Sequence, residues 1–168
     1  MQKCVNELLL LEKHWFPKKE NHSMYIRPNS ICMDNKIGLG RVTKMKTFVV
    51  LCPVGSYYPK PCSLYCDTDS VRSWPQGFGD KKLGSNYAPT LKAQYNSGQL
   101  YGCDSVLWLL HDYITEAGTM NFFIFWKNEN GENELITPPL DGTILPGVTR
   151  DTILTIAKEM NEFKVTIG

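Results

Sequence analysis

The sequence predicts an α/β-type domain, because segments with strand periodicity and segments with helical periodicity occur together along one chain. Asn121 to Lys127 and Glu134 to Thr137 are β-forming and flank the favoured turn pair Asn130-Gly131, a pattern typical of a hairpin. After Pro146-Gly147, an apolar stripe predicts a helix of about three turns, formed by Ile153, Leu154, Ala157 and Met160. With 168 residues and no repeat or obvious linker, one globular domain is expected.

The first third of the chain predicts one helix and two strands. Residues 3–14 carry an apolar stripe and are followed by Trp15, Phe16 and Pro17, which favours an amphipathic helix that ends there. Residues 24–26 and 47–52 are rich in β-forming side chains. Because residues 47–52 form a continuous apolar run, we expect that strand to be buried.

The middle of the chain predicts irregular structure, then a helix and a strand. Residues 52–69 contain Pro53, Pro59, Pro61 and Gly55, which favour irregular chain. Pro89 suits the first turn of a helix that runs through residues 91–94 and ends near Asn96 and Gly98. Residues 106–110 are again strand-like.

Composition excludes several classes of partner and location. Eighteen basic and 17 acidic residues give a net charge of +1, so no global field favours nucleic acid or a membrane surface. No apolar run is long enough to cross a bilayer, and residues 1–14 match neither a secretory signal nor a mitochondrial presequence. We therefore expect a cytoplasmic protein.

The cysteines predict neither disulfides nor a metal site. Six cysteines are too few and too scattered for a disulfide scaffold, so free thiols are expected. Cys62 and Cys66 have a plausible ligand spacing, but no second Cys/His pair sits at a matching interval. We expect no metal.

The glycine-rich segment from Trp74 to Tyr87 is weak evidence when read alone. Gly77, Gly79 and Gly84 form neither a dinucleotide fingerprint nor a nucleotide-binding loop, and a surface turn explains them equally well. The string Gly79-Asp-Lys-Lys-Leu-Gly-Ser-Asn-Tyr87, however, resembles the cofactor-lysine segment of branched-chain amino acid aminotransferases. Three further strings agree in order, namely Tyr25-Ile-Arg-Pro28, Ile114-Thr-Glu-Ala-Gly-Thr-Met-Asn121 and Thr137-Pro-Pro-Leu-Asp-Gly-Thr-Ile-Leu-Pro-Gly-Val-Thr-Arg150.

The resemblance covers essentially the whole chain and is closest to the animal cytosolic type. It implies the α/β fold of the fold-type-IV pyridoxal-phosphate enzymes, with residues 1–168 as the linker region and most of the large cofactor-binding domain. The implied cofactor is pyridoxal 5'-phosphate. The implied activity is amino transfer between leucine, isoleucine or valine and 2-oxoglutarate, in a homodimer if the protein is complete.

Three residues are implied to act on the cofactor ring. Lys82 matches the lysine whose amine binds the cofactor aldehyde and later moves a proton, whereas Lys81 should point away in an extended segment. Glu116 matches the carboxylate that keeps the ring nitrogen protonated, and Tyr87 the hydroxyl that bonds the phenolate oxygen. Outside the resemblance, Lys82 would be a solvated charge and Tyr87 a packing aromatic. Glu116 alone would be a surface acid, but its place just before the apolar residues 121–126 favours a buried and paired role.

A helix that starts near Val148 and Thr149 also predicts an anion site on physical grounds. Its first backbone amides lack partners, and Gly147 allows close approach, although water or Thr149 could cap the helix instead. In the resembling family, amides at these two positions hold the cofactor phosphate. By the same comparison, Thr119 would engage the substrate carboxylate and Tyr25 would line the side-chain pocket, with Arg27 orienting Tyr25 or contacting the other domain.

Relative to the family, the chain is expected to be truncated at both ends. The small N-terminal domain supplies a phosphate-clamping arginine, and the C-terminal end supplies a threonine contact and the remaining pocket wall. Losing that arginine would weaken cofactor binding by roughly one to two orders of magnitude. Two alternatives therefore stay open. One is another fold-type-IV activity, such as D-amino acid transamination or aminodeoxychorismate cleavage. The other is an inactive isoform or fragment that pairs with an intact subunit.

Overall fold

The structure, a computed structural model, describes residues 1–168 and divides them into two compact units, Met1–Pro61 and Cys62–Gly168. The sequence itself had shown no obvious linker to mark this division. The boundary falls in the proline-rich stretch that was expected to be irregular, and no helix or strand covers residues 55–63. Each unit is described by itself.

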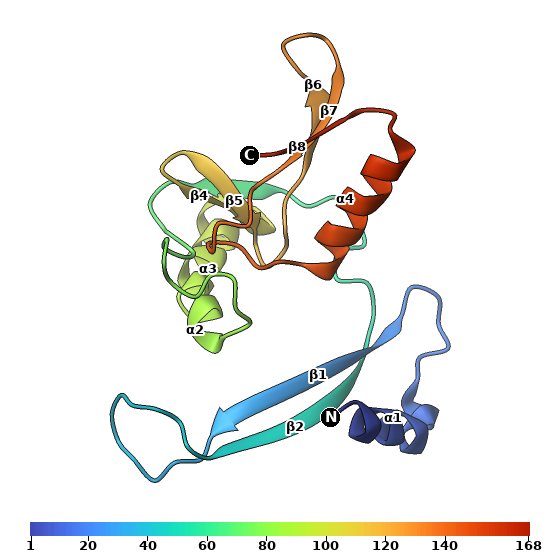
Figure 1. Cartoon of the computed structure of the whole chain (residues 1–168), viewed down its shortest axis with the longest axis vertical. Coiled ribbons are helices and arrows are strands. Elements are labelled where there is room, and N and C mark those ends of the chain that lie inside the picture. The colour runs from blue at the N-terminus through green and yellow to red at the C-terminus, as the bar shows by residue number, and fades with distance from the viewer. The chain divides into compact units, whose positions relative to one another are not determined.

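The unit Met1–Pro61 consists of one helix and one two-stranded sheet (Figure 1). Helix α1 spans Gln2–Leu11 and is followed by a 3-10 turn, Lys13–Trp15, which confirms the predicted helix. Strands β1, Ser23–Cys32, and β2, Met45–Val54, pair antiparallel, with Tyr25 opposite Cys52. β1 is longer than predicted because both strands of a two-stranded sheet are edges, where Pro28 is tolerated.

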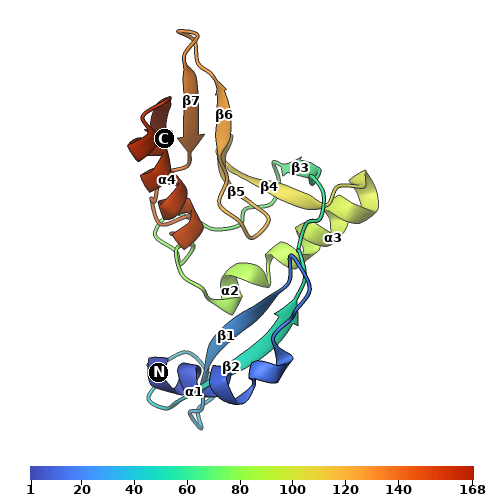
Figure 2. The ribbon, with the colours of Figure 1, turned by 90° about the vertical axis from the view of Figure 1, so that its right-hand side faces the viewer.

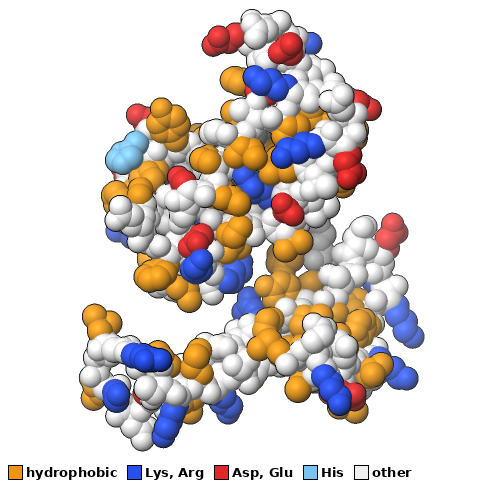
Figure 3. Space-filling model, viewed as in Figure 1, with side chains coloured by type: hydrophobic (Ala, Val, Ile, Leu, Met, Phe, Trp, Pro, Cys, Tyr) orange, Lys and Arg blue, Asp and Glu red, His pale blue; other side chains and the backbone are white.

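The prediction that residues 47–52 are buried was wrong. β2 pairs with β1 alone, and most of its side chains are exposed or half-buried, including Phe48 and Val50. Figure 3 shows hydrophobic side chains, drawn in orange, on the surface of this unit. An apolar run predicts a strand whose side chains can be buried. Burial also requires another helix or sheet to pack against that strand.

In the unit Cys62–Gly168, a first sheet has the order β3-β4-β5, with β3 spanning Leu64–Asp67, β4 Ser105–Leu110 and β5 Tyr113–Ala117. β3 and β4 are parallel, and β4 and β5 are antiparallel. The crossover between the parallel strands contains the short helix α2, Gly84–Tyr87, and helix α3, Thr90–Tyr101. Ala93 of α3 packs with Val106 and Trp108 of β4 as the buried core of this layer.

Three of these elements were missed in the sequence. β3 follows the proline-rich stretch, and α2 is a single turn of only four residues. β5 follows β4 through His111 and Asp112, which both have positive φ, 49° and 66°. Two successive residues with positive φ are typical of a tight hairpin turn. The usual sequence signal for such a turn is Asn-Gly or Asp-Gly, so the pair His111-Asp112 did not predict one.

A second sheet in this unit has the order β6-β7-β8 and packs beside a helix (Figure 2). β6, Ile124–Lys127, and β7, Asn133–Thr137, form the predicted hairpin, with Gly131 at φ 78° in its turn. Helix α4, Val148–Met160, confirms the predicted helix and leads to β8, Lys164–Ile167, which pairs parallel with β7. Cys4, Cys32, Cys52, Cys66 and Cys103 are free thiols, as expected.

Candidate functional site

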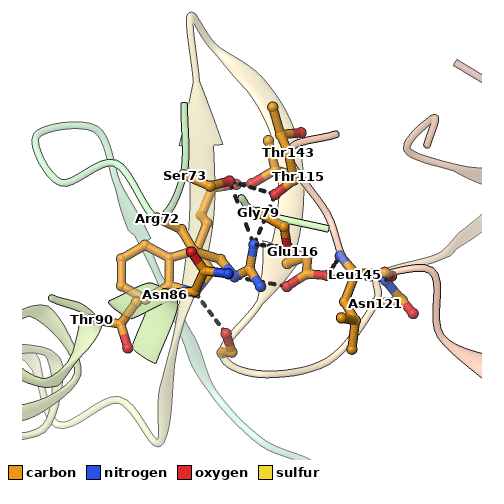
Figure 4. Close-up of polar contacts among 12 residues, drawn as sticks. Arg72, Ser73, Gly79, Asn86, Thr90, Thr115, Glu116, Asn121, Thr143 and Leu145 are labelled. Atoms are coloured by element: carbon orange, nitrogen blue, oxygen red, sulfur yellow. Dashed lines mark hydrogen bonds and ion pairs between the residues drawn. The ribbon is translucent and has the colours of Figure 1, made fainter. Parts of the chain in front are cut away.

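Glu116 is the centre of a buried polar cluster in the unit Cys62–Gly168. It lies near the end of β5 and is only 1% exposed. Its Oε1 accepts hydrogen bonds from the Leu145 backbone N–H at 2.9 Å and from Asn121 Nδ2 at 3.1 Å. Its Oε2 forms an ion pair with Arg72 Nε at 2.8 Å (Figure 4). Glu116 is thus buried and paired on both oxygens, as its place before an apolar segment favoured.

The bonding of Glu116 leaves room for one more donor. An ionised carboxylate offers about four acceptor positions, two on each oxygen. The three donors just named occupy both positions of Oε1 and one position of Oε2. The remaining position on Oε2 can accept one further N–H, which is what a protonated ring nitrogen would offer.

Two opposing effects act on the pKa of Glu116. Burial raises the pKa of this carboxyl, because the charged form loses water. Arg72 is the strongest of the groups that oppose this rise in pKa, followed by the Leu145 N–H and the charge of Lys82. The positive charge of Lys82 thus acts on the pKa of Glu116 in the same direction as that of Arg72.

Lys82 lies in the exposed loop before α2, and its neighbour Lys81 is directed elsewhere. The Lys82 Nζ lies 4.9 Å from the centroid of the Tyr87 ring, a cation–π distance. Lys81 Nζ instead pairs with Asp80 Oδ2 at 2.7 Å, as expected for a lysine without a site role. Lys82 and Tyr87, predicted to act together, are therefore brought together by the one-turn helix α2.

The loop that carries Lys82 is fixed by Asn86. Its Nδ2 donates to the backbone oxygens of Phe78 and of Lys81, the latter at 2.8 Å. Because Asn86 is buried, these two bonds close the glycine-rich segment into one compact turn. The segment is a turn, as its glycines alone suggested, and it also presents Lys82.

The first turn of α4 has open backbone amides. Gly147 is its N-cap residue, with φ −72° and ψ 137°, and no side chain caps the helix, so Thr149 does not. Val148 is 83% exposed. The first-turn amides therefore have no side-chain partner at the positive end of the helix, and an anion site there stays a prediction.

Asn121 connects this helix end to Glu116. Its Nδ2 donates both to Glu116 Oε1 and to the Leu145 backbone oxygen, at 2.8 Å in the latter case. A Cβ on Gly147 would meet the Asn121 Oδ1 at 2.1 Å, so the glycine and the amide lie in close contact. The residues predicted for the ring nitrogen and for the phosphate are thus joined through one side chain.

Sequence reasoning did not single out Arg72 or Asn121. Arg72 is one arginine in an irregular segment, without periodicity or motif to mark it. Asn121 ends the string that starts at Ile114 and was expected to open a strand, but β6 starts only at Ile124. A signal was available only for Asn121, because it belongs to a string shared with the resembling family.

The residues predicted to touch substrate lie in different units. Thr119 is exposed in the tight turn from Ala117 to Met120, next to Gly118 at φ 56°. Tyr25 lies in β1 of the unit Met1–Pro61, with Arg27 Cζ 5.4 Å from its ring centroid, the orienting contact expected of Arg27. The contribution of Tyr25 to a pocket with Thr119 stays a prediction.

The structure contains neither a candidate metal cluster nor a candidate membrane-spanning helix. No group of three or more His, Cys, Asp or Glu side chains is arranged to hold a metal ion. No helix has both the length and the apolar character needed to span a membrane.

Comparison with known proteins gives the family of the chain. A profile for amino-transferase class IV matches residues 9–168. The chain belongs to this family. The predicted fold class is thereby confirmed, as is the resemblance to branched-chain aminotransferases, because the curated relatives carry that name.

This family member is similar along nearly its whole length to longer proteins. It is 51% identical to a branched-chain-amino-acid aminotransferase of Dictyostelium discoideum, covering 96% of the chain and 44% of the relative. The cytosolic and mitochondrial enzymes of Rattus norvegicus are both 47% identical, with 96% of the chain and 41% and 42% of the relatives covered. The chain therefore spans less than half the length of these relatives, and the identities do not separate the two cellular types.

Solved structures support the fold. A branched-chain aminotransferase of Thermoproteus uzoniensis, determined with norvaline, superposes with a TM-score of 0.76 at 21% identity, covering 98% of the chain and 53% of that structure. An aminotransferase of Brucella abortus bound to the cofactor PLP gives a TM-score of 0.75 at 18% identity, covering 98% of the chain and 57% of that structure. At these identities the likeness concerns the fold alone.

Proposed function

We propose that this chain forms the lysine-bearing part of a pyridoxal-phosphate-dependent branched-chain aminotransferase. Such an enzyme transfers the amino group between leucine, isoleucine or valine and 2-oxoglutarate. The observation that carries the proposal is the buried Glu116 carboxylate, which keeps one acceptor position on Oε2 open while Asn121 ties it to the uncapped end of α4. The names of the relatives support the same reading.

The residues of this chain fit pyridoxal phosphate in chemical type. When bound, the cofactor supplies an aldehyde for the amino group and a ring that accepts electrons from the substrate α-carbon. Glu116 Oε2 would accept the ring N–H and favour its protonated form. The amides of Val148 and Thr149 would donate to the phosphate, and the Tyr87 hydroxyl would donate to the phenolate oxygen.

Lys82 is the catalytic residue of the proposal. Its Nζ would hold the cofactor through the aldehyde, and the free amine would take the proton from the substrate α-carbon. The Lys82 ammonium lies over the face of the Tyr87 ring. Thr119 would receive the substrate carboxylate, and Tyr25 would face the branched side chain.

A labelling experiment tests this assignment with a matched control. The purified chain is incubated with pyridoxal phosphate, reduced with borohydride to fix the cofactor on the amine that holds it, and mapped by mass spectrometry. We expect the adduct on Lys82, retained in Lys81→Ala and absent in Lys82→Ala. The control is well matched because Lys81 is the adjacent lysine and engages only exposed Asp80 in the ion pair described. An adduct spread over many lysines, or none in the wild type, would contradict the proposal.

Substrate and partner belong to the same proposal. A panel of leucine, isoleucine, valine and D-alanine with 2-oxoglutarate separates the branched-chain activity from a D-amino acid activity. We further propose that the protein works as a homodimer in the cytoplasm, in keeping with the cytosolic relatives. Size-exclusion chromatography with light scattering measures the oligomeric state.

A second candidate function is association with an intact subunit by a chain that has no turnover of its own. The observation that favours it is the large set of exposed apolar side chains on β1 and β2 and in the loop between them, namely Ile31, Met33, Ile37, Leu39, Met45, Phe48 and Val50. Apolar surface of this extent is typical of interfaces. Specific labelling of Lys82 without transamination of leucine would favour this candidate.

A further inference from the structure

Arg72 is the most deeply buried charge near Glu116 and has no role in the function proposed so far. Its side chain is 2% exposed. Nε forms the 2.8 Å ion pair with Glu116 Oε2, whereas Nη1 donates to the Thr143 backbone oxygen at 2.8 Å and more weakly to that of Gly79 at 3.4 Å. Figure 4 shows the guanidinium between Glu116 and these carbonyl groups. Different nitrogens of one rigid group thus serve the carboxylate and the backbone.

The physical effect of Arg72 on Glu116 follows from burial. A carboxylate removed from water loses several kcal/mol of hydration unless a charge and hydrogen bonds replace it, and otherwise it takes up a proton. Arginine is suited to this place because it stays charged at every accessible pH and its planar fork has a fixed direction. Neither the Asn121 amide nor the Leu145 N–H carries a full charge, so Arg72 supplies the only cation bonded to Glu116.

The bond also fixes the orientation of the carboxylate. With Arg72 on one side of Oε2 and two donors on Oε1, the carboxylate cannot rotate without breaking bonds to all three groups. The acceptor position that remains free therefore has one direction. Through Gly79 O and Thr143 O, the same guanidinium joins the segment that precedes Lys82 to the segment that precedes α4.

We propose that Arg72 is a positioning residue for the cofactor: it holds Glu116 ionised and oriented so that Oε2 can accept the N–H of the cofactor ring nitrogen. The inference rests on the proposed function, since it assumes that a pyridine ring lies against Glu116. It goes further because it assigns to Arg72 an effect, through Glu116, on the ring nitrogen of the cofactor. An arginine that only stabilised the fold would affect cofactor binding equally with or without that nitrogen.

The test compares two ligands that differ at that atom. Pyridoxal phosphate and its 1-deaza analogue, in which CH replaces the ring nitrogen, are titrated against the protein, and binding is followed by tryptophan fluorescence. Replacing Arg72 by Met removes the charge and keeps much of the apolar stem. We expect Arg72→Met to weaken pyridoxal phosphate binding by about 10- to 100-fold, the effect of one charge-assisted hydrogen bond, and to leave the affinity for the deaza analogue nearly unchanged.

A double-mutant cycle provides a second, independent measurement. If Arg72 acts through Glu116, then Arg72→Met adds little to the affinity loss already caused by Glu116→Gln. If Arg72 acts on the fold, the two losses add. Circular dichroism of the cofactor-free variants checks that each one is folded. Should Arg72→Met not fold, Arg72→Lys serves in both comparisons, because an ammonium keeps the charge but lacks the fork.

The outcomes separate this inference from the proposed function. No binding of pyridoxal phosphate to the wild type would overturn the proposed function itself. Binding by the wild type, with equal losses for both ligands in the Arg72 variant or additive losses in the cycle, would overturn only the role of Arg72. A loss confined to the ligand that has the ring nitrogen, together with non-additivity, supports it.

Discussion

Gly147 and Asn121 lie in such close contact that a Cβ on residue 147 would stand 2.1 Å from the side-chain oxygen of Asn121. The Asn121 amide nitrogen is at the same time committed to Glu116 Oε1 and to the Leu145 backbone oxygen. The side chain therefore cannot move away from residue 147 without losing these bonds. The N-cap glycine of α4 and the buried carboxylate are in this way mechanically linked.

Gly147→Ala is expected to destabilise the protein by about 1–3 kcal/mol, the usual effect of overpacking. The φ and ψ of Gly147 suit alanine, so the effect comes from the contact with Asn121 and not from backbone strain. Urea denaturation measures it. Gly98→Ala is the control, because the new Cβ would meet nothing closer than Cys103 O at 3.8 Å and alanine favours a helix interior. Equal stabilities of the two variants would contradict the link.

Val148→Pro is expected to weaken binding of pyridoxal phosphate by about 10- to 100-fold and to leave binding of unphosphorylated pyridoxal unchanged. Val148 is the first residue of α4, where proline is tolerated, and the extended conformation of Gly147 suits the residue before a proline. The substitution thus removes one amide donor and keeps the helix.

Val148→Ala keeps that amide and serves as the control for the loss of the side chain. Parallel titrations of the two variants with both ligands provide the measurement. A similar loss for pyridoxal as for its phosphate would mean that the α4 amides do not hold the phosphate.

Gly79→Ala is expected to destabilise the folded chain by about 1–3 kcal/mol and to reduce labelling of Lys82. Its Cβ would stand 2.5 Å from the Thr143 backbone oxygen and 2.7 Å from Ser73 Cβ, so a backbone segment that accepts from Arg72 must shift. Gly84→Ala, in the same glycine-rich segment, has nothing within 4 Å and should match the wild type. Thermal unfolding and borohydride labelling of both variants test the difference, and a stable, fully labelled Gly79→Ala would rule it out.

Glu134 gives the pairing of β7 with β8 a predictable pH dependence. A hydrogen bond from the Thr166 hydroxyl, followed by bonds from Lys164 and Trp126, holds the pKa of this carboxyl below its ordinary value. A carboxyl whose pKa is lowered on folding contributes stability above its unfolded pKa, about 4.3, and loses it as the pH falls through the lower folded value.

Glu134→Gln should accordingly flatten the acid side of a plot of melting temperature against pH, below about pH 5. Glu129→Gln changes an exposed carboxyl of the same β6–β7 hairpin and is the control. If both variants keep the acid slope of the wild type, the bonds from Thr166 and Lys164 do not stabilise the ionised form.

The elements whose signals are local could be predicted from neighbouring residues alone. The apolar stripe of α4, its glycine entry and the Asn-Gly turn of the β6–β7 hairpin depend on neighbouring residues only, and all were predicted. The ordered strings were sufficient for the family and pointed to Lys82, Tyr87 and Glu116. Missed elements such as β5 had unusual turn residues, and the turn at His111-Asp112 is stabilised by strand pairing and not by its own composition.

The tertiary structure alone decided how charges far apart in the chain meet. Arg72, Glu116 and Asn121 come from three segments of the chain. No periodic pattern in the sequence predicts that Arg72 pairs with Glu116 or that Arg72 is buried. The exposure of β2 is a similar case, because an apolar run specifies what a strand can bury and not what covers it. Periodicity reports contacts along one element, whereas ion pairs and covered faces depend on contacts between elements.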